Sequence, residues 1–296
     1  MNSPPETNPC FEALLQYIKQ THNFDYTGYK RPSLMRRVQY RMDMLPIEGY
    51  SNYTNYLTEN PEEFLQLFNT IEINLTTFFR NASSWNHIAA NVIPQIIASK
   101  SSDEPIRVWS AGCASGEEVY TLAILLSEAL GVEQFRLRVQ IFGTDLDRDA
   151  ISQARQGSYD SNQVSGIPDY LLKKYFEQIN GKYVFRKDLR RNILLVQHNL
   201  IEDAPMSKID LLVCRNTLIY LNSETQLRVL VRFHFGLKDN GFLFLGHTEI
   251  VQSEIASLFR GVNNEHRIFS KIGKGTLHPR LLVKALKRSH PAGKLL

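Results

Sequence analysis

From residue 105 onward, short β-rich runs alternate with segments of helical periodicity, and this alternation constrains the fold more than any other feature of the sequence. The runs lie at 106–109, 139–142, 209–213 and 241–245, and the helical segments lie at 117–130, 147–156 and 223–236. Neighbouring parallel strands need a crossover connection, and a helix usually supplies it. The pattern therefore predicts an α/β domain with a mostly parallel sheet covered by helices on both faces.

Residues 158–196 break this rhythm. Glycine and proline residues interrupt the segment, and only short apolar runs at 182–185 and 192–196 indicate strands. We interpret it as an inserted small β-subdomain. The dipeptide Asn180-Gly181 is typical of a two-residue turn and predicts a tight hairpin within this segment.

Residues 1–74 show helical periodicity without a strand-like run. Two helices are indicated by apolar residues at helical spacing, namely Phe11, Leu14, Leu15 and Ile18 in the first and Leu34, Val38 and Met42 in the second. A third helix is predicted to begin at 60–63, where Asn60 can cap it and Pro61 suits its first position. We therefore expect a small all-α N-terminal domain.

Several classes of protein are disfavoured. No apolar run approaches the roughly 18–20 residues that a membrane span needs, and the first seven residues do not resemble a signal peptide. The three cysteines, Cys10, Cys113 and Cys214, are widely spaced and form no C-x-x-C motif, which speaks against a disulfide framework or a zinc site. We expect a soluble, cytoplasmic protein without a metal or direct membrane insertion, and small buried roles for Cys113 and Cys214.

The net charge of +4 belongs to the end of the chain. Residues 271–296 hold seven Lys and Arg residues and no acid, so the first 270 residues carry a net charge of −3. A slightly acidic body without a broad basic face disfavours a nucleic-acid partner. We expect 273–296 to form a basic tail.

A glycine-bearing turn follows the predicted strand at 106–109. Gly112 and Gly116 are spaced G-x-x-x-G, at the carboxyl end of the strand, where open α/β sheets bind nucleotides. Glu117 and Glu118 come next, at the start of the predicted helix, where they would repel a pyrophosphate. The turn therefore favours a cationic ligand without phosphate over a nicotinamide dinucleotide, and a purely structural turn is the alternative.

The next predicted strand ends in Gly143-Thr144-Asp145, which places a carboxylate at the same edge of the sheet. An acid at this position commonly accepts hydrogen bonds from ribose hydroxyls. Asp145 could instead cap the helix that starts near Asp147. Taken with the glycine turn, Asp145 favours an adenosine ligand.

Five segments in one order resemble the CheR family of chemotaxis protein-glutamate methyltransferases. They are 74–80, 109–118, 143–145, 214–220 and 244–249. The similarity covers roughly 10–272 and implies a substrate-docking helical domain at 1–74, a linker at 75–104 that contributes to the cofactor site, and an S-adenosylmethionine-binding, Rossmann-like domain at 105–272. The inserted β-subdomain at about 158–196 would belong to the last of these.

The resemblance implies that S-adenosyl-L-methionine is the cofactor and S-adenosyl-L-homocysteine the product. In the family pattern Glu117 faces the cationic methionine portion and Asp145 the ribose. Asn199-Leu200 lies at the adenine region. The cofactor-binding residues that follow are Asn74, Thr76, Arg80, Gly112, Glu117, Asp145, Asn199, Leu200, Asn216 and Thr217.

The implied reaction moves a methyl group from sulfur to a glutamate side-chain oxygen of a chemoreceptor-type protein. A carboxylate is already ionised at pH 7, so no general base is needed, and catalysis rests on orientation and on the exclusion of water. Arg80 and the Tyr220 hydroxyl are the expected catalytic residues, which orient the substrate carboxylate. A non-catalytic S-adenosylmethionine-binding signalling module is the alternative function.

A basic stretch in the second predicted helix is a candidate docking surface. Arg36, Arg37 and Arg41 would face the acidic, Glu-rich cytoplasmic helices of methyl-accepting chemoreceptors, although a solvated helix face is the alternative. Some family members bind a receptor's C-terminal pentapeptide through a glycine-rich loop in the β-subdomain. The corresponding stretch here, 175–185, has a single glycine, so we expect an enzyme that is independent of that peptide. Separately, we expect the protein to be a monomer.

Overall fold

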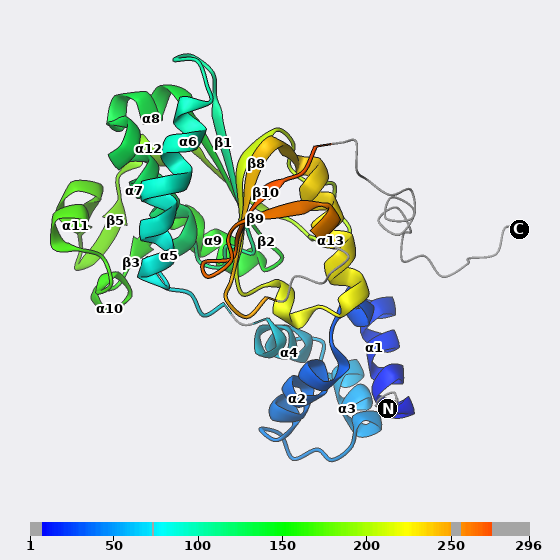
Figure 1. Ribbon diagram of the computed structural model, residues 1–296. Coiled ribbons are helices and arrows are strands. Elements are labelled where there is room, and N and C mark those ends of the chain that lie inside the picture. Colours follow the sequence, from blue (N-terminus) through cyan, green and yellow to red (C-terminus); the bar gives the residue numbers. More distant parts are fainter. Residues whose placement is uncertain (1–7, 73, 250–255, 274–296) are drawn as a thin grey trace, which may run out of the picture. The chain divides into compact units, whose positions relative to one another are not determined.

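The structure is a computed structural model that describes residues 8–72, 74–249 and 256–273 (Figure 1). The described residues divide into two compact units. The first lies within Met1–Ile73 and Tyr220–Thr225, and the second lies within Asn74–Ile219 and Gln226–Leu296. The basic end at 274–296 lies outside the described residues, so the expected tail stays a prediction.

The first unit is all-α, as its periodicity predicts. It contains α1 (Pro9–His22), the short 3-10 turn η1 (Tyr26–Gly28), α2 (Arg31–Met42), α3 (Tyr50–Glu59) and α4 (Glu63–Ile71). Asn8 starts α1, because its side-chain oxygen accepts hydrogen bonds from the amides of Cys10 and Phe11. The side chains predicted for the inner faces of the first two helices are all buried, namely Phe11, Leu14, Leu15, Ile18, Leu34, Val38 and Met42.

The predicted cap at Asn60 is wrong. Asn60 ends α3, with its Nδ2 donating to a main-chain oxygen one turn earlier at 3.0 Å, and α4 begins at Glu63 without a side-chain cap. The preceding helix is inconspicuous in the sequence because it buries only Tyr53 and Leu57. The predicted helix nevertheless begins within the expected range 60–63, at Glu63.

A short segment from late in the sequence completes the first unit. The Lys30 amide donates to the Tyr220 carbonyl at 2.9 Å, and the Asn222 amide donates to the Gly28 carbonyl at 2.9 Å. An isolated antiparallel bridge joins the residues between these pairs. Main-chain hydrogen bonds therefore hold Tyr220–Thr225 among residues about 190 positions earlier.

The second unit is built on a seven-stranded sheet in the order β6-β2-β1-β7-β8-β10-β9. Its strands are β1 (Ile106–Ala111), β2 (Val139–Asp145), β6 (Ile193–Gln197), β7 (Ile209–Cys214), β8 (Leu237–Leu245), β9 (Phe259–Asn263) and β10 (Ile268–Lys271). The first five strands of that order are parallel neighbours, whereas β10 runs antiparallel to both of its neighbours, β8 and β9. The mostly parallel sheet is confirmed, and the β9–β10 hairpin adds to it.

Helices cover both faces of this sheet, and β1 shows the two layers because successive side chains of a strand point to opposite faces. Val108 shares a buried cluster with Leu122, whereas the Trp109 ring meets the Phe233 ring edge-on at 5.4 Å. Leu122 and Phe233 come from different helices, which therefore lie on opposite faces. The helices of this unit are α5 (Ala82–His87), η2 (a π-turn, Ile88–Val92), α6 (Ile93–Ala98), α7 (Glu117–Leu130), α8 (Val132–Arg138), α9 (Arg148–Gln156) and α13 (Ser223–Gly236).

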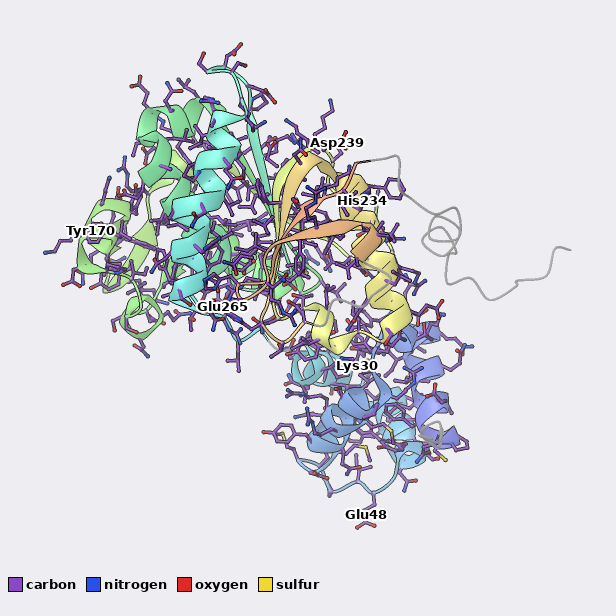
Figure 2. The ribbon with its side chains drawn as sticks, in the orientation of Figure 1. Lys30, Glu48, Tyr170, His234, Asp239 and Glu265 are labelled. Carbon is purple, nitrogen blue, oxygen red and sulfur yellow. The ribbon has the colours of Figure 1, made fainter. Side chains whose placement is uncertain are left out.

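The inserted segment forms a separate three-stranded sheet in the order β3-β5-β4. Its elements are β3 (Ser158–Tyr159), α10 (Ser161–Val164), α11 (Asp169–Tyr175), β4 (Phe176–Ile179), β5 (Lys182–Phe185) and α12 (Lys187–Arg190). The tight hairpin is confirmed, since Asn180 and Gly181 have φ of +51° and +78° between paired strands. Tyr170 projects outward from α11 (Figure 2). The run at 192–196 belongs to the main sheet as β6, which corrects its assignment to the subdomain.

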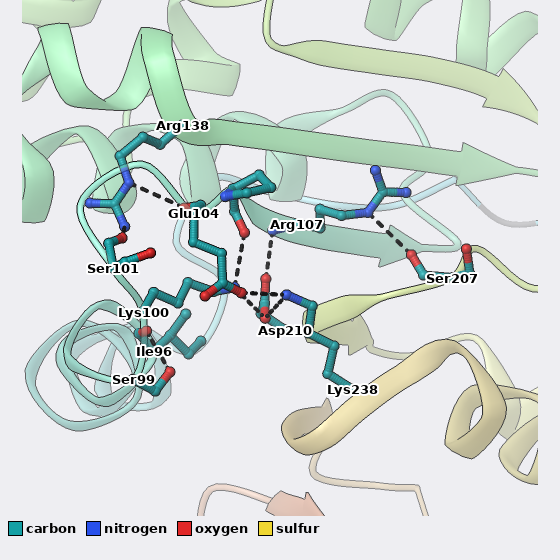
Figure 3. A network of polar contacts seen from close by, with 11 residues as sticks. Ile96, Ser99, Lys100, Ser101, Glu104, Arg107, Arg138, Ser207, Asp210 and Lys238 are labelled. Carbon is teal, nitrogen blue, oxygen red and sulfur yellow. Dashed lines mark hydrogen bonds and ion pairs between the residues drawn. The ribbon is translucent and has the colours of Figure 1, made fainter.

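A cluster of charged side chains lies at the amino ends of β1 and β7 (Figure 3). The Asp210 carboxylate accepts from the Arg107 amide at 2.8 Å and lies 3.0 Å from Lys100 Nζ. Glu104 pairs with Lys100 at 2.9 Å and with Lys238 at 3.0 Å. The side chains of Lys100 and Asp210 are only 3% and 8% exposed, and each has a second ion-pair partner, Glu104 for Lys100 and Lys238 for Asp210 at 3.4 Å.

Candidate functional site

The carboxyl ends of β2, β1 and β7 lie side by side, because these strands are parallel neighbours. The segments at these ends carry Asp145, Gly112 and Asn216 respectively. At such an edge, main-chain amides and helix starts face the space where open α/β sheets bind ligands. The candidate cofactor site is built here from residues of the second unit.

The glycine turn after β1 is held closely between its two neighbours. The amides of Gly112 and Cys113 both donate to the Thr144 carbonyl, at 2.7 and 2.9 Å. Gly112 has φ of +78°, and a Cβ added there would lie 2.1 Å from Thr217 Oγ1. A side chain at this position would displace the loop after β7, so glycine keeps the turn and that loop in contact. Cys113 and Cys214 are buried and free, as expected.

Asp145 is bound to the glycine turn. One carboxylate oxygen accepts from the Ala114 amide at 2.8 Å, and the other accepts from the Asp147 amide at 3.0 Å. Burial raises the pKa of Asp145, although these amides oppose the shift. The cap of α9 is Asp147, whose Oδ1 accepts from two amides of that helix, so the alternative role of Asp145 as its cap is wrong.

Two buried glutamates begin α7. Glu117 accepts a hydrogen bond from the Ser115 hydroxyl at 2.7 Å, and Glu118 accepts one from the Ser110 hydroxyl at 2.7 Å. Burial raises the pKa of both carboxyls, an effect that Ser115 opposes at Glu117. A cation in contact with them would offset this cost of desolvation.

Linker residues reach the same sheet edge. Asn74 Nδ2 donates to the Asp147 carboxylate, and the Phe79 amide donates to the Thr121 hydroxyl of α7 at 3.2 Å. Asn74 is thereby fixed to the loop that carries Asp145. These two hydrogen bonds tie the linker to the segment after β2 and to helix α7.

Arg80 closes the linker into a loop. Its Nη1 donates to the Leu75 carbonyl at 3.0 Å, while the side chain stays partly exposed. Thr76 is also partly exposed within this loop. Phe79 next to Arg80 has φ of +51°, an uncommon backbone conformation for a bulky residue. A strained linker around a partly exposed guanidinium is typical of a functional segment.

Arg215 organises this region, and sequence reasoning missed it. Its guanidinium donates to the Arg80 carbonyl at 2.8 Å and to the Asn81 side chain at 2.7 Å, and it lies 3.7 Å from Glu118. Burial lowers the pKa of Arg215, and Glu118 opposes this shift. It also lies over two aromatic rings, those of Trp85 and Phe244. The sequence does contain a signal for this role. Arg215 directly follows β7, a fully buried strand, and a charged side chain at such a position needs a buried partner.

Glu249 is a second residue whose role the sequence did not show. One carboxylate oxygen accepts from the amides of Thr217 and Leu218, each at 3.0 Å, and the other accepts from the Gly246 amide. Asn216 has φ of +60° at this loop. Glu249 therefore fixes the conformation of Asn216-Thr217 from the end of β8.

Asn199 and Leu200 follow β6. The Asn199 side chain accepts from the Ile201 amide at 2.9 Å, so its turn is locally closed, and Leu200 is partly buried beside it. The His198 amide donates to the Asp145 carbonyl at 2.8 Å, which ties this turn to the end of β2. Ten residues expected at the cofactor therefore all lie in the second unit, at the ends of β1, β2, β6 and β7 or in the linker.

Tyr220 and the candidate docking arginines lie in the first unit. Tyr220 lines a shallow recess together with Lys30, Arg36 and Arg37. The described residues give neither Arg36 nor Arg37 a carboxylate partner within ion-pair distance. Tyr220 and Arg80 belong to different units, so their joint action on a substrate stays a prediction.

Arg41 differs from the other two arginines. Its guanidinium forms two hydrogen bonds with Glu63, at 2.8 and 2.7 Å, and the Tyr53 hydroxyl donates to the same carboxylate at 2.7 Å. Burial alone would raise the pKa of Glu63, but these bonds outweigh it and lower the pKa. Arg41 therefore holds α2 against α4, which gives it a structural task inside the unit.

The groups that converge at the sheet edge are carboxylates, hydroxyls and main-chain amides. Such a set suits a ligand that carries a positive charge and several hydroxyls, as an adenosine sulfonium does. Within the ranges that the structure describes, no group of three or more His, Cys, Asp or Glu residues could hold a metal ion. No helix there is long and apolar enough to cross a membrane.

Two family models match the chain. Residues 74–268 match the one described as "CheR methyltransferase, SAM binding domain", and residues 10–71 match the one described as "CheR methyltransferase, all-alpha domain". The boundary between the two matches falls at 71–74, where the first unit gives way to the second.

Similar proteins from three bacteria extend these matches. A "Chemotaxis protein methyltransferase" of Borreliella burgdorferi is 30% identical over 71% of this chain and 77% of its own length. The "Chemotaxis protein methyltransferase 2" of Vibrio cholerae is 30% identical over 88% of this chain and 91% of its own length. An "Uncharacterized 104.1 kDa protein in hypE 3'region" of Rhodobacter capsulatus is 32% identical over 88% of this chain, which spans only 27% of that longer protein.

Proposed function

The chain belongs to the CheR methyltransferase family, uses S-adenosylmethionine as its cofactor, and, we propose, transfers the methyl group to glutamate side chains of chemoreceptor-type proteins in the cytoplasm. Family membership confirms the resemblance seen in the sequence. S-adenosylmethionine-dependent protein methylation in chemotaxis signalling is the established part of this statement. The glutamate acceptor is the proposal.

The residues at the sheet edge fit the cofactor. Glu117 would face the sulfonium, since it is buried and its carboxylate is bound by the Ser115 hydroxyl, with no cation of the described residues within ion-pair distance. Asp145 would accept from the ribose hydroxyls with lone pairs that its two amide bonds leave available. Asn199-Leu200 would border the adenine, and Asn216-Thr217 the methionine portion.

The bound cofactor supplies an activated methyl group on sulfur. The chain has to bring a glutamate oxygen in line with that methyl group and keep water away. Arg80 suits the first task, because its side chain is partly exposed and a guanidinium can hold a carboxylate through two parallel donors. A substrate glutamate arrives ionised, so none of these residues has to remove a proton from it.

The observation that carries the acceptor proposal is the basic recess of the first unit. Arg36 and Arg37 line it with Tyr220, whose hydroxyl is a hydrogen-bond donor for a carboxylate. A recess with two arginines that form no ion pair among the described residues suits an acidic helix of a receptor. A monomer that acts without the receptor pentapeptide remains part of this proposal.

The test is transfer of radiolabelled methyl groups to receptor cytoplasmic fragments from the same cell. Carboxyl methyl esters are released by base, so base-labile label on glutamate is the expected result. Arg80→Ala should reduce turnover at least 100-fold at saturating cofactor, whereas Arg107→Ala, at the opposite ends of the strands, should not. Retained binding of S-adenosylhomocysteine without methylation of any receptor fragment would instead indicate a non-catalytic signalling module.

A further inference from the structure

A second concave surface lies at the edge strand of the main sheet, away from the cofactor edge. It has a volume of about 450 Å³ and lies between the end of α9, α12 and β6. Its lining includes four cations and no acidic residue, the cations being Arg155, Lys187, Arg190 and Arg191. The size is that of a small-ligand site, and the charge selects for anions.

This cleft is separate from the cofactor site. Helix α9 begins at Arg148, beside Asp147, which bonds Asp145 through its amide, and it ends at the cleft. Seven residues separate Arg148 from Arg155, and at 1.5 Å per residue the helix carries the chain about 10 Å from the cofactor edge. A ligand bound at the cleft therefore does not compete with an adenosine at Asp145.

Two of the four cations are engaged by the protein itself. Arg190 donates to the main-chain oxygens of Arg155 and Gln156, which caps the end of α9. Its aliphatic stem passes Gly157, where an added Cβ would lie 3.2 Å from Arg190 Cδ. Arg155 donates twice to the Leu195 carbonyl, at 3.1 and 2.8 Å.

The other two cations, Lys187 and Arg191, are exposed at the cleft. Across the described part of the chain, neither of them lies within ion-pair distance of a carboxylate. The nearest acid in the sequence, Asp188, is taken by Arg186 at 2.8 Å. Lys187 and Arg191 are thus the cations available for a ligand.

An apolar wall completes the cleft. Strand β6 contributes Ile193, Leu194 and Leu195, and Leu194 is 50% exposed although it is a large apolar side chain on a strand. A flat apolar group placed on Leu194 would remove this surface from water. The cleft therefore offers cations and an apolar surface side by side.

The main chain of β6 argues against an added peptide strand. Asn192 O accepts from the Ile141 amide of β2, so in the parallel ladder Leu194 also bonds to β2, and Leu195 directs its carbonyl outward. That outward carbonyl is taken by Arg155. The middle of the free edge of β6 is therefore not available to the main chain of an added strand. A ligand at this cleft would be recognised by side chains, which suits a compact molecule.

We propose that this cleft binds a small phosphate-bearing ligand with a planar ring, a nucleotide in chemical class. Lys187 and Arg191 hold the phosphates, and Leu194 supports the ring. Arg155 and Arg190 shape the cleft and add positive potential without leaving their carbonyl partners.

Calorimetry at low salt tests the proposal, with S-adenosylhomocysteine present in excess to fill the cofactor site. The probes are GDP, pyrophosphate and guanosine. GDP should bind at one site per chain, pyrophosphate at least threefold more weakly, and guanosine not measurably. Absence of saturable GDP binding at millimolar concentration overturns the proposal.

Three variants separate the parts of the cleft. K187A/R191A should weaken GDP binding at least tenfold, and L194A should weaken binding of GDP but not of pyrophosphate. K173A/R260A removes the same two charges from exposed positions elsewhere in the unit and should bind GDP like the wild type. Equal affinity of GDP for all four proteins contradicts the assignment.

A last comparison distinguishes a small ligand from an acidic protein. A glutamate-rich peptide that bound more tightly than GDP, and lost its binding in K187A/R191A, would show that the cleft docks a protein and would overturn the nucleotide proposal. Methyl transfer should proceed at the wild-type rate in K187A/R191A. The nucleotide proposal and the methyltransferase proposal can therefore fail separately, the first in the binding measurements and the second in the methylation assay.

Discussion

Neighbouring glutamates at the start of α7 have different environments. Glu118 shares its carboxylate between the Ser110 hydroxyl and the Arg215 guanidinium, so its charge is balanced inside the protein. Glu117 has a hydroxyl partner, and burial raises its pKa. Of the two, Glu117 is therefore the residue that a bound cation would stabilise most.

This difference predicts how pH affects cofactor binding. As pH falls from 7.5 to 4.5, the ordinary value for a glutamate, Glu117 becomes more than half protonated because its pKa is raised, and most of its attraction for a sulfonium is lost. The affinity ratio of S-adenosylmethionine to S-adenosylhomocysteine should fall by about fivefold, the equivalent of roughly 1 kcal/mol for one screened charge pair. Calorimetry measures both affinities across this range.

Glu117→Gln should make that ratio independent of pH, because only the sulfonium distinguishes the two ligands. Asp145→Asn should weaken both ligands alike, since both carry the ribose. A wild-type affinity ratio that stays constant between pH 7.5 and 4.5 would show that Glu117 does not contact the sulfonium.

Arg215 should act as a positioning residue for Arg80. Arg215→Lys keeps a positive charge near Glu118, but one ammonium cannot reproduce the donors that hold the Arg80 carbonyl and the Asn81 side chain. We expect kcat to fall more than tenfold while the KM for the receptor changes less than threefold. Steady-state kinetics measures both, with Arg107→Lys as the matched control. A variant that lost only thermal stability, with kcat intact, would assign Arg215 a purely structural role.

At the residue scale, the role of a side chain can be predicted from the sequence only when its interaction partners lie close along the chain or at positions that the order of the strands already fixes. Gly112 and Asp145 follow strands whose order along the chain already places them at one sheet edge. Arg215 and Glu249 act on groups 135 and 32 residues away, and no local pattern indicates such partners. Arg41 was expected at the surface for the same reason, because Glu63 lies 22 residues further on.

At the scale of elements, strong periodicity gave correct boundaries. Helices α7 and α13 and strands β1, β2 and β7 match the predicted segments within a few residues. The helix α3 was hidden by its polar composition, and β6 was placed in the subdomain because apolar runs do not show which sheet they join. Sheet membership is decided by pairing across distant segments, and this is why it escapes a local pattern.

The charged cluster at the amino ends of the strands should be a major contribution to the stability of the second unit. Asp210→Ala takes one of two carboxylates from the buried Lys100 and leaves the Arg107 amide without its acceptor, so the free energy of unfolding should drop by about 1–3 kcal/mol. Urea denaturation at pH 7 measures this change. Glu104→Gln, at the exposed side of the same cluster, is the control and should change stability little.

The same cluster has a defined acid dependence. Hydrogen bonds from Lys100 and Lys238 lower the pKa of Glu104 from 4.5 to about 2. The contribution of the Glu104 carboxylate to folding stability is therefore complete above pH 4.5 and is lost as pH falls towards 2. Equal stability of wild type and Asp210→Ala at pH 7 would show that the buried pair contributes nothing net.

At the scale of the whole molecule, charge distribution matters more than net charge. The +4 of the sequence comes from residues 271–296, most of which lie outside the described ranges, while the first 270 carry −3. Deletion of 274–296 should therefore leave methyl transfer intact. The charge expected to affect the encounter with an acidic receptor is local, at Arg36 and Arg37.

Charge reversal tests this expectation. R36E/R37E should reduce kcat/KM for receptor fragments about tenfold at low salt and much less at high salt, because exposed charges are screened. K173E/R260E makes the same change in net charge in the other unit and should leave kcat/KM near the wild-type value. Methylation rates of both variants, measured against salt concentration, test this expectation. An equal loss of kcat/KM in both variants would indicate a general effect of net charge.

The segment Tyr220–Thr225 has a consequence for how this chain can be divided. Because these residues complete the first unit while 219 and 226 belong to the second, the backbone passes between the units three times. A single cut near residue 73 would therefore yield an N-terminal fragment that lacks the carbonyl that Lys30 uses and the amide that Gly28 uses. Recombination between relatives can exchange the two units cleanly only if the short loop is exchanged as well, so their inheritance is linked.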